Sequence, residues 1–182
     1  MFIYLEVAIL KIARIGHPIL LKKTKEIKEL GSEKIKEIVY NMSETMIDAN
    51  GIGLAAPQVH LNLRLFIIRD IESKNKEMQI KALINPVIEK LSDETIEAWE
   101  GCLSIPGMLG LVRRFSKIKY SAYDLQGKKI SNNLEGIQAR VVQHEFDHLN
   151  GILYTSRLVH KDAFGHAEEI EQYWQKNEKE KQ

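Results

Sequence analysis

The chain has 182 residues, one cysteine and a formal net charge of +1, with acidic and basic residues interspersed. This length predicts a single domain over residues 1–182 that buries a core without disulfides, and one cysteine cannot form an internal disulfide in any case. The near-neutral charge argues against nucleic-acid recognition and against binding to an anionic membrane. The cysteine usage favours a reducing compartment, the cytoplasm.

The apolar stretch Met1–Leu10 is short, and Glu6 interrupts it. It lacks a basic start and a small-residue cleavage site, so it predicts neither a membrane span nor a signal peptide. We expect residues 1–8 to form an extension or an edge strand, and residues 9–15 to form a short strand or an extended lead-in to the domain.

A first helix is predicted after Ser32, because apolar side chains recur at helical spacing from Ile35 to Ala49. Ser32 is a suitable N-cap, and Asn50-Gly51 predicts the end of the helix. The segment Gly51–Gln58 is rich in small residues and ends in one amide. Its glycines allow the backbone to approach a ligand or another strand closely, although an ordinary tight turn is an equally good interpretation.

Strand-forming residues dominate the middle of the chain, with turn signals at Ser92-Asp93 and Gln126-Gly127 and a polar hairpin tip predicted at residues 74–77. The predicted strands are 63–69, 82–88, 94–99, 117–123 and 128–134. Pro86 predicts an edge or a bulge in its strand. The Pro/Gly-containing segment after Ser104 is expected to be a loop that ends near Gly110.

A second predicted helix carries the strongest chemical signal in the chain. Apolar side chains recur at helical spacing from Ile137 to Leu149, and Gly151 predicts the helix end. Within this range lies His144-Glu145-Phe146-Asp147-His148, in which positions four apart share one helix face. H-E-x-x-H on a helix is typical of metal-dependent hydrolases, with two histidine ligands and glutamate as general base, although paired histidines are also common on surfaces.

Apolar spacing predicts a C-terminal helix over residues 161–182 that ends in a charged, frayed stretch. The fold expected from these elements is α+β, with antiparallel sheets packed around the central metal-binding helix, an N-terminal helix and a C-terminal helix. Four further histidines lie outside any ligand spacing and are expected on the surface or satisfied in the core. They are His17, His60, His160 and His166.

A catalytic tetrahedral metal site needs a third protein ligand, and its source is left open by the residues alone. The extended pattern H-E-x-x-H-x-x-G-x-x-H fails, because Tyr154 stands at its last position. Glu168 or Glu169 of the last helix would make a zinc endopeptidase. Cys102 would make a Cys/His/His site, although a lone cysteine is more often a small buried hydrophobe. A purely structural metal site is the third alternative, but it needs a fourth protein ligand.

Three motifs occur together and in a fixed order. They are the small-residue segment ending in Gln58, the Glu-Gly-Cys-Leu-Ser run at 100–104, and His-Glu-x-x-His-Leu-x-Gly preceded by Gln143. With this combination the chain resembles the peptide deformylases from about Ile9 to Leu158. The resemblance implies a cytoplasmic metallohydrolase that removes the formyl group from the N-terminal formyl-methionine of nascent chains and releases formate.

The resemblance also implies which residues take part. It implies a metal held by Cys102, His144 and His148, physiologically Fe²⁺ (iron), with Zn²⁺, Ni²⁺ or Co²⁺ able to replace it. Formyl-methionyl peptides and nascent chains would be the substrates, and the ribosome is a candidate partner. No membrane partner is implied.

Further roles follow from the same resemblance. Glu145 would be the catalytic acid/base, and a metal-bound water would be the nucleophile. The side-chain amide of Gln58 and the backbone N–H of Leu103 would face the reacting carbonyl, where donors stabilise developing negative charge. Ile52 and Gly53 would contact the substrate backbone.

Charged residues near these motifs are candidates for supporting roles. Asp147 or Glu100 is expected to accept the free ring N–H of a ligating histidine or to pair with Arg114 or Arg140, and a surface ion pair is the alternative. The segment 107–110 lacks the basic residue that some members of the family use near the second residue of the substrate. The preference after methionine therefore stays open.

Overall fold

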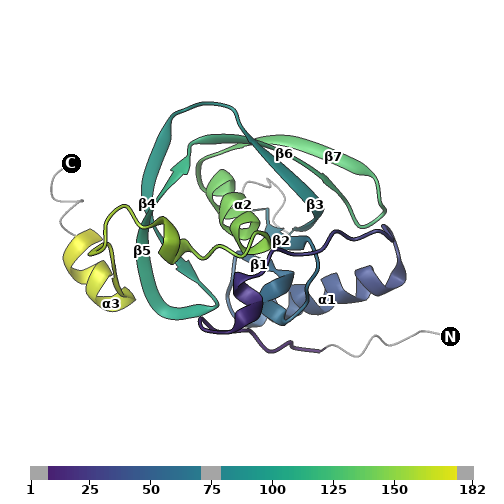
Figure 1. Cartoon of the computed structure of the whole chain (residues 1–182), viewed down its shortest axis with the longest axis horizontal. Helices are drawn as coiled ribbons and strands as arrows, with labels where there is room; N and C mark the ends of the chain where they lie inside the picture. The colour runs from purple at the N-terminus through teal and green to yellow at the C-terminus, as the bar shows by residue number, and fades with distance from the viewer. Residues whose placement is uncertain (1–7, 71–78, 176–182) are drawn as a thin grey trace.

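Two antiparallel sheets enclose one buried helix in the computed structural model, which describes residues 8–70 and 79–175 (Figure 1). The five-stranded sheet has the order β1-β2-β3-β6-β7, and the three-stranded sheet has the order β4-β5-β8. The strands are β1 Gly53–Ala55, β2 Leu65–Arg69, β3 Ile80–Lys90, β4 Thr95–Cys102, β5 Ile105–Phe115, β6 Lys117–Tyr123, β7 Lys129–Glu135 and β8 Phe164–His166. The α+β prediction is confirmed.

Three α-helices accompany the sheets in the described residues: α1 Glu33–Asp48, α2 Gly136–Leu149 and α3 Ala167–Ile170. Short 3-10 helices cover Pro18–Leu21, Ala56–Val59 and Tyr154–Arg157, and a π-helical turn, Glu171–Gln175, continues α3. None of the described helices has the length and apolar character needed to cross a membrane.

Helix α2 is the centre of the packing. It lies between the two sheets and contacts strands of both (Figure 1). Its apolar side chains pack against the five-stranded sheet. On that side Ala139, Val142 and Leu149 join a core cluster with Phe66 and Leu83. Because the helix is covered on most sides, its polar residues need partners inside the protein.

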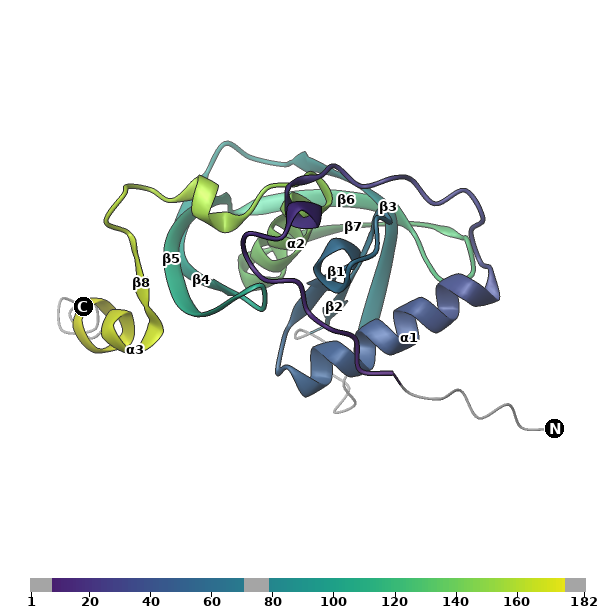
Figure 2. The same ribbon diagram turned by 60° about the horizontal axis from the view of Figure 1, so that its bottom comes forward.

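Helix α1 covers the opposite face of the five-stranded sheet (Figure 2). Its predicted N-cap, Ser32, has the extended backbone of a cap but makes no side-chain capping hydrogen bond. Met42 and Met46 are completely buried against Leu54 and Ile67. This packing fixes β1, and with β1 the segment that carries the small residues.

Residues 8–15 form an extended lead-in, as one of the two expectations had it, and not a strand. The N–H of Ala13 donates to the carbonyl of Gln58 at 2.7 Å, and the N–H of Ile15 donates to the carbonyl of Ser104 at 2.9 Å. The lead-in thus connects two segments that are far apart in sequence. Residues 1–7 and the predicted hairpin tip at 74–77 lie outside the described residues.

The prediction of a loop after Ser104 is wrong. Residues 105–115 form β5, which pairs with β4 along one edge and with β8 at Met108–Gly110 along the other. Pro106 and Gly107 suggested a loop, but Cys102 lies opposite Ile105, so the two strands form a tight hairpin. Pairing on both edges outweighs the weak strand preference of the local sequence.

The C-terminal helix begins later than expected. Residues 161–163 form a turn, β8 pairs with β5, and the helix begins at Ala167 instead of residue 161. Strand pairing of Phe164–His166 with the edge of β5 explains the difference, because helical spacing alone does not register a partner from elsewhere in the chain. Residues 176–182 lie outside the described part.

Candidate metal centre

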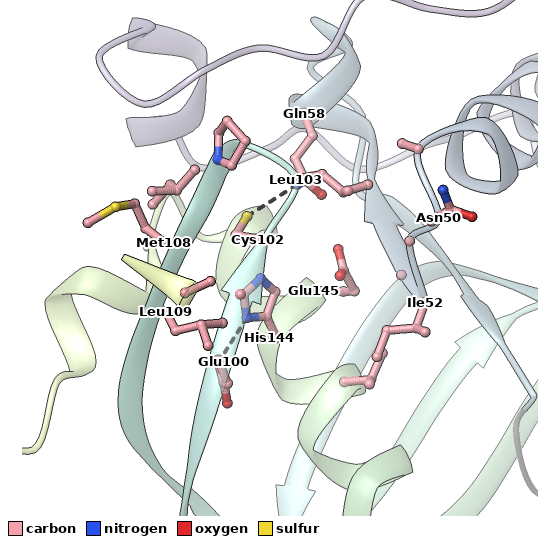
Figure 3. A pocket seen from close by; sticks show the side chains of 18 of the residues that line it. Asn50, Ile52, Gln58, Glu100, Cys102, Leu103, Met108, Leu109, His144 and Glu145 are labelled. Atoms are coloured by element: carbon pink, nitrogen blue, oxygen red, sulfur yellow. Dashed lines mark hydrogen bonds and ion pairs between the residues drawn. The ribbon is translucent and has the colours of Figure 1, made fainter. Parts of the chain in front are cut away.

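Helix α2 places His144 and His148 about one turn apart on one face. The ring of His144 points toward β4, between Cys102 and Glu100 (Figure 3). Their ring centroids are 5.0 Å apart, with the ring planes inclined by 72°. Both side chains are buried. Burial lowers the pKa of His148, which keeps this imidazole neutral and able to bind a cation.

Cys102 completes a cluster with these histidines. It lies at the turn of the β4–β5 hairpin, and its Sγ is 3.3 Å from Nε2 of His148. The sulfur and one ring nitrogen of each histidine lie within 4.8 Å of one another. The expectation that Cys102 joins the histidine pair is therefore confirmed.

The cluster fits a tetrahedrally coordinated cation. Bonds of about 2.3 Å to sulfur and about 2.0–2.1 Å to nitrogen place neighbouring ligand atoms roughly 3.5 Å apart. The observed sulfur–nitrogen separation of 3.3 Å is close to that value. The alternative carboxylates, Glu168 and Glu169, are exposed on α3 and do not belong to the cluster. Three protein ligands leave one position open, as in catalytic sites.

Glu100 fixes the orientation of His144. Its Oε2 is 2.9 Å from Nδ1 of His144, so Nε2 is the nitrogen left for a cation (Figure 3). Burial raises the pKa of Glu100, but hydrogen bonds from Arg114 and His144 outweigh this effect and hold the pKa well below its usual value. Glu100 thus stays ionised behind the ligand. The expectation that Glu100 or Asp147 takes this role is settled in favour of Glu100.

Asp147 pairs with arginines instead of a ligating histidine. It is buried, and it accepts hydrogen bonds from Arg114 and Arg157. Glu100 accepts from Arg114 and also from Arg140, whose Nη1 lies 2.7 Å from Oε1. The predicted pairing of these acidic residues with Arg114 and Arg140 is confirmed, and the pairs are buried instead of superficial. Arg157 was not anticipated.

Glu145 faces the cavity beside the cluster (Figure 3). Burial raises its pKa to about 7, and its Oε2 has no hydrogen-bond partner among the described residues. A Cβ atom on Gly53 would lie 2.4 Å from Oε1 of Glu145, so only glycine leaves room for this carboxyl group. A buried unpaired oxygen is costly unless a water or substrate group completes it.

Gln58 holds its amide N–H₂ toward the cysteine. The side chain is 1% exposed, and its Oε1 accepts a hydrogen bond from the N–H of Ala55 at 2.8 Å. Its Nε2 therefore points the other way, to Sγ of Cys102 at 3.5 Å (Figure 3). The same Nε2 lies 3.3 Å from Oγ of Ser104. Sequence reasoning missed Ser104 as the residue that helps to orient this amide.

The edges of two strands face each other across the site. The carbonyl of Ile52 accepts a hydrogen bond from the N–H of Arg69 in β2, and pairing alternates along a strand. The N–H and carbonyl of Gly53 therefore point away from β2, toward the cavity. On the opposite side of the site, Glu100 of β4 forms the hydrogen-bonded pair with Gly110 of β5. The backbone groups of the next residue, Gly101, therefore point away from β5.

A cavity of about 690 Å³ lies between these edges. It is lined by seven of the eight candidate site residues, Ile52, Gly53, Gln58, Cys102, Leu103, His144 and Glu145. His148 is buried beneath Cys102 instead. The other histidines are exposed, as expected: His17, His60, His160 and His166.

Tyr154 is a further residue that sequence reasoning noted only for not being histidine. Its ring stacks on His144 with centroids 6.0 Å apart, and its hydroxyl donates to the carbonyl of Met108 at 3.2 Å. A Cβ on Gly110 would lie 2.7 Å from this ring. The aromatic ring thus fills the space between the histidine and β5.

Comparison with known proteins agrees with this geometry. The family model for polypeptide deformylase matches residues 9–164. Peptide deformylase 1 of Bordetella pertussis is 43% identical over 162 residues, which cover 86% of this chain and 92% of that relative. The residues matched by the family model include all three motifs.

Solved structures share the fold. A probable peptide deformylase from Synechococcus phage S-SSM7 has a TM-score of 0.77 and 38% identity, covering 82% of this chain and 99% of its own. A peptide deformylase from Synechococcus elongatus, solved in complex with actinonin, has a TM-score of 0.79 and 35% identity. The match covers 85% of this chain and 83% of that chain. The chain therefore belongs to the polypeptide deformylase family, the hydrolases that remove the N-terminal formyl group from nascent polypeptides.

Proposed function

We propose that the chain removes the formyl group at the Cys102–His144–His148 centre, with Fe²⁺ as the physiological ion. The convergence of one sulfur and two imidazole nitrogens beside an open cavity carries this proposal. A bound divalent cation supplies a Lewis acid and a water whose pKa is lowered toward neutrality. Zn²⁺, Ni²⁺ and Co²⁺ also accept this ligand set, so the ligands alone do not select iron.

Glu145 is the acid/base in this proposal. Its raised pKa of about 7 allows it to take up a proton from the attacking water and to give a proton to the departing amine. The same carboxyl group serves both steps, because it lies beside the cluster and its Oε2 has no partner in the described part of the chain. Gly53 supports this role by leaving the space that the carboxyl group occupies.

Gln58 and Leu103 are the donors for the formyl oxygen. The Gln58 amide is neutral, buried and held by Ala55, so it needs no reorganisation when negative charge develops. The Leu103 N–H belongs to the turn directly after Cys102, and its side chain packs against Gly51. Donors of this kind are worth about 3–4 kcal/mol each in comparable sites.

The peptide itself is proposed to bind as an added strand between β1 and β4. The free edge at Gly53 and the free edge at Gly101 face the cavity, and strand addition uses main-chain hydrogen bonds that any peptide can make. Ile52 is 44% exposed beside this edge and is proposed to contact the substrate backbone together with Gly53. Formyl-methionyl peptides with varied downstream residues are the expected substrates.

We also place the protein in the cytoplasm as one metallohydrolase domain, on the basis of its single unpaired cysteine and its deformylase fold. The ribosome is the proposed partner, since nascent chains emerge there. Helix α3 supports this proposal because it lies at the outer end of the molecule (Figure 1). The side chains of Tyr173 and Trp174, which follow it, are exposed.

The test is formate release from formyl-Met-Ala-Ser by protein loaded with Fe²⁺ or Ni²⁺ without oxygen, because ferrous iron next to a thiolate is prone to oxidation. We expect turnover in the parent protein, loss of metal in Cys102→Ala, and both metal and turnover retained in Glu168→Ala. Glu168 is the matched control, since it is exposed on α3 and does not belong to the Cys102–His144–His148 cluster. Metal retained by Cys102→Ala but lost by Glu168→Ala would reject the proposed ligand set.

A further inference from the structure

A row of charged groups leads from the metal ligand His144 to the segment that follows helix α2. In order, it consists of His144, Glu100, Arg114, Asp147 and Arg157, and we call it the ion-pair chain. Each member contacts the next, and the three central members are buried. These residues come from β4, β5, α2 and the 3-10 helix Tyr154–Arg157.

The carboxylate of Glu100 has all of its acceptor positions occupied. Oε1 accepts from Nε of Arg114 at 2.9 Å and from Arg140 at 2.7 Å. Oε2 accepts from Nη2 of Arg114 at 2.9 Å and faces Nδ1 of His144 at 2.9 Å. The two parallel contacts with Arg114 fix the plane of this carboxylate, and the plane decides where the hydrogen bond to His144 points.

Arg114 is in turn held by Asp147. Two of its nitrogens are committed to Glu100, and its remaining Nη1 donates to Oδ2 of Asp147. A guanidinium is planar and rigid, so its tilt is set by both carboxylates together. Any shift of Asp147 is therefore passed to the plane of Glu100.

Arg157 holds Asp147 from the far side. Its Nε lies 2.5 Å from Oδ2 and its Nη2 lies 2.7 Å from Oδ1, a two-point contact with the carboxylate. Asp147 follows His144 by about one helical turn, so the ion-pair chain leaves α2 at His144 and returns to it at Asp147 before it ends at Arg157. The Arg157 side chain is 42% exposed, whereas that of Arg114 is 4% exposed. Arg157 is thus the member that can be replaced without opening the core.

We propose that Arg157 is a positioning residue for the metal ligand His144, and that it acts through the charged groups between them. Its two-point contact fixes Asp147, Asp147 fixes the tilt of Arg114, and the resulting plane of Glu100 sets the ring of His144. The competing explanation is that Arg157 only neutralises a buried carboxylate. The inference rests on the metal site of the proposed function, but not on the peptide that it hydrolyses.

Arg157→Lys separates these two explanations, because lysine keeps the charge but cannot make the two-point contact. The protein is loaded with Co²⁺, and two quantities are measured: the visible absorption of the cobalt, which reports ligand geometry, and the rate of cobalt release to a chelator. Substitution of a residue that contacts a metal ligand directly typically weakens metal binding by roughly 10–100-fold. Arg157 is several contacts away from His144, so its effect should be smaller. We expect release about threefold to tenfold faster in both Arg157→Lys and Arg157→Gln, with a shifted cobalt spectrum.

Arg113→Gln is the matched control, since Arg113 makes an exposed ion pair with Glu97 on the β4–β5 hairpin, outside the ion-pair chain. It should leave the spectrum and the release rate at parent values. The proposal would be overturned if Arg157→Lys had the parent cobalt spectrum and the parent release rate. It would also be overturned if Arg157→Gln changed neither quantity. A parent protein that bound no cobalt would reject the metal site itself, which is a failure of the proposed function.

A double-mutant cycle tests the route of the effect. If Arg157 acts through Asp147, Arg157→Gln should add little to the release rate in an Asp147→Asn background. Additive effects of the two substitutions would contradict the proposal. Urea unfolding of each metal-free variant shows whether faster release follows merely from lower stability. Release rates that track the free energy of unfolding across the whole series, including Arg113→Gln, would also count against positioning.

Discussion

The β4–β5 hairpin carries one arginine–glutamate pair on each of its two sides, and the two pairs differ in their surroundings. On the outer side, Arg113 and Glu97 have 60% and 40% of their side-chain surfaces exposed. On the inner side, Arg114 and Glu100 have 4% and 5% exposed and face helix α2. The same two residue types therefore serve a solvated contact on one side and the support of a metal ligand on the other.

Burial changes what an ion pair contributes to stability. An exposed pair contributes about 0–1 kcal/mol, because water screens the charges and mobile side chains lose entropy. A buried pair contributes little net stability, but removal of one partner leaves an uncompensated charge. The inner pair is thus difficult to alter without consequences for His144, whereas the outer pair is free to change.

Substitution of the carboxylate that faces the cavity should have the largest effect. We expect Glu145→Gln to lower kcat by roughly 10²–10⁴-fold, since the amide cannot transfer protons. Metal content, measured by elemental analysis, should stay at the parent level. Glu97→Gln on the outer side should leave kcat unchanged. Substantial turnover in Glu145→Gln would show that another group carries the proton.

Removal of the buried amide should come next. Gln58→Ala is expected to lower kcat by roughly 10²–10³-fold with a smaller change in KM, because the hydrogen bond strengthens as charge develops. Steady-state kinetics with formyl-Met-Ala-Ser measure this split. Gln126→Ala, in an exposed turn, is the matched control. A rise in KM alone would mean that Gln58 only binds the substrate.

The contrast between the two pairs is tested directly by Glu100→Gln and Glu97→Gln. We expect Glu100→Gln to weaken metal binding by roughly 10–100-fold, because it supports His144. It should also lower the free energy of unfolding by about 3–5 kcal/mol, because buried Arg114 loses one of its two charged partners. Glu97→Gln should change the free energy by less than about 1 kcal/mol. Metal competition assays and urea unfolding measure both quantities, and equal effects would remove the distinction.

The pH dependence of the stability lost in Glu100→Gln should be the smallest effect. The pKa of Glu100 is below its usual value of 4.5 in the folded protein, so its ionised form contributes stability above about pH 4.5. This contribution decreases as the pH falls through the folded pKa. The destabilisation caused by Glu100→Gln in metal-free protein should therefore shrink between about pH 5 and pH 3. A difference that stays constant over this range would contradict the assigned ionisation.

Local patterns could be predicted from the sequence because they depend on local geometry. The spacing of His144 and His148 needs only a helix, and the bulge predicted at Pro86 appears as a register shift between Ile84 and Val87. The Cys102 ligand came from the resemblance to a family, since nothing in the spacing of residues connects it to a helix that begins 34 positions later.

Contacts that depend on pairing between distant segments could not be predicted from local sequence patterns. The strand β5 was hidden by Pro106 and Gly107, and only its pairing with β4 and β8 reveals it. Arg157 was missed for the same reason: it lies ten positions after its partner Asp147, beyond the end of helix α2. Charge pairs across a helix end follow no fixed spacing, so the sequence carries no periodic signal for them.

The extended lead-in at residues 8–15 has a practical consequence. Its backbone donates one hydrogen bond to the carbonyl of Gln58 and another to the carbonyl of Ser104. These two residues contact each other on the side of the cavity that carries Cys102, where the Gln58 amide donates to Ser104. Trimming or tethering the amino-terminal arm would therefore loosen the junction that holds this amide, and affinity tags are better attached elsewhere.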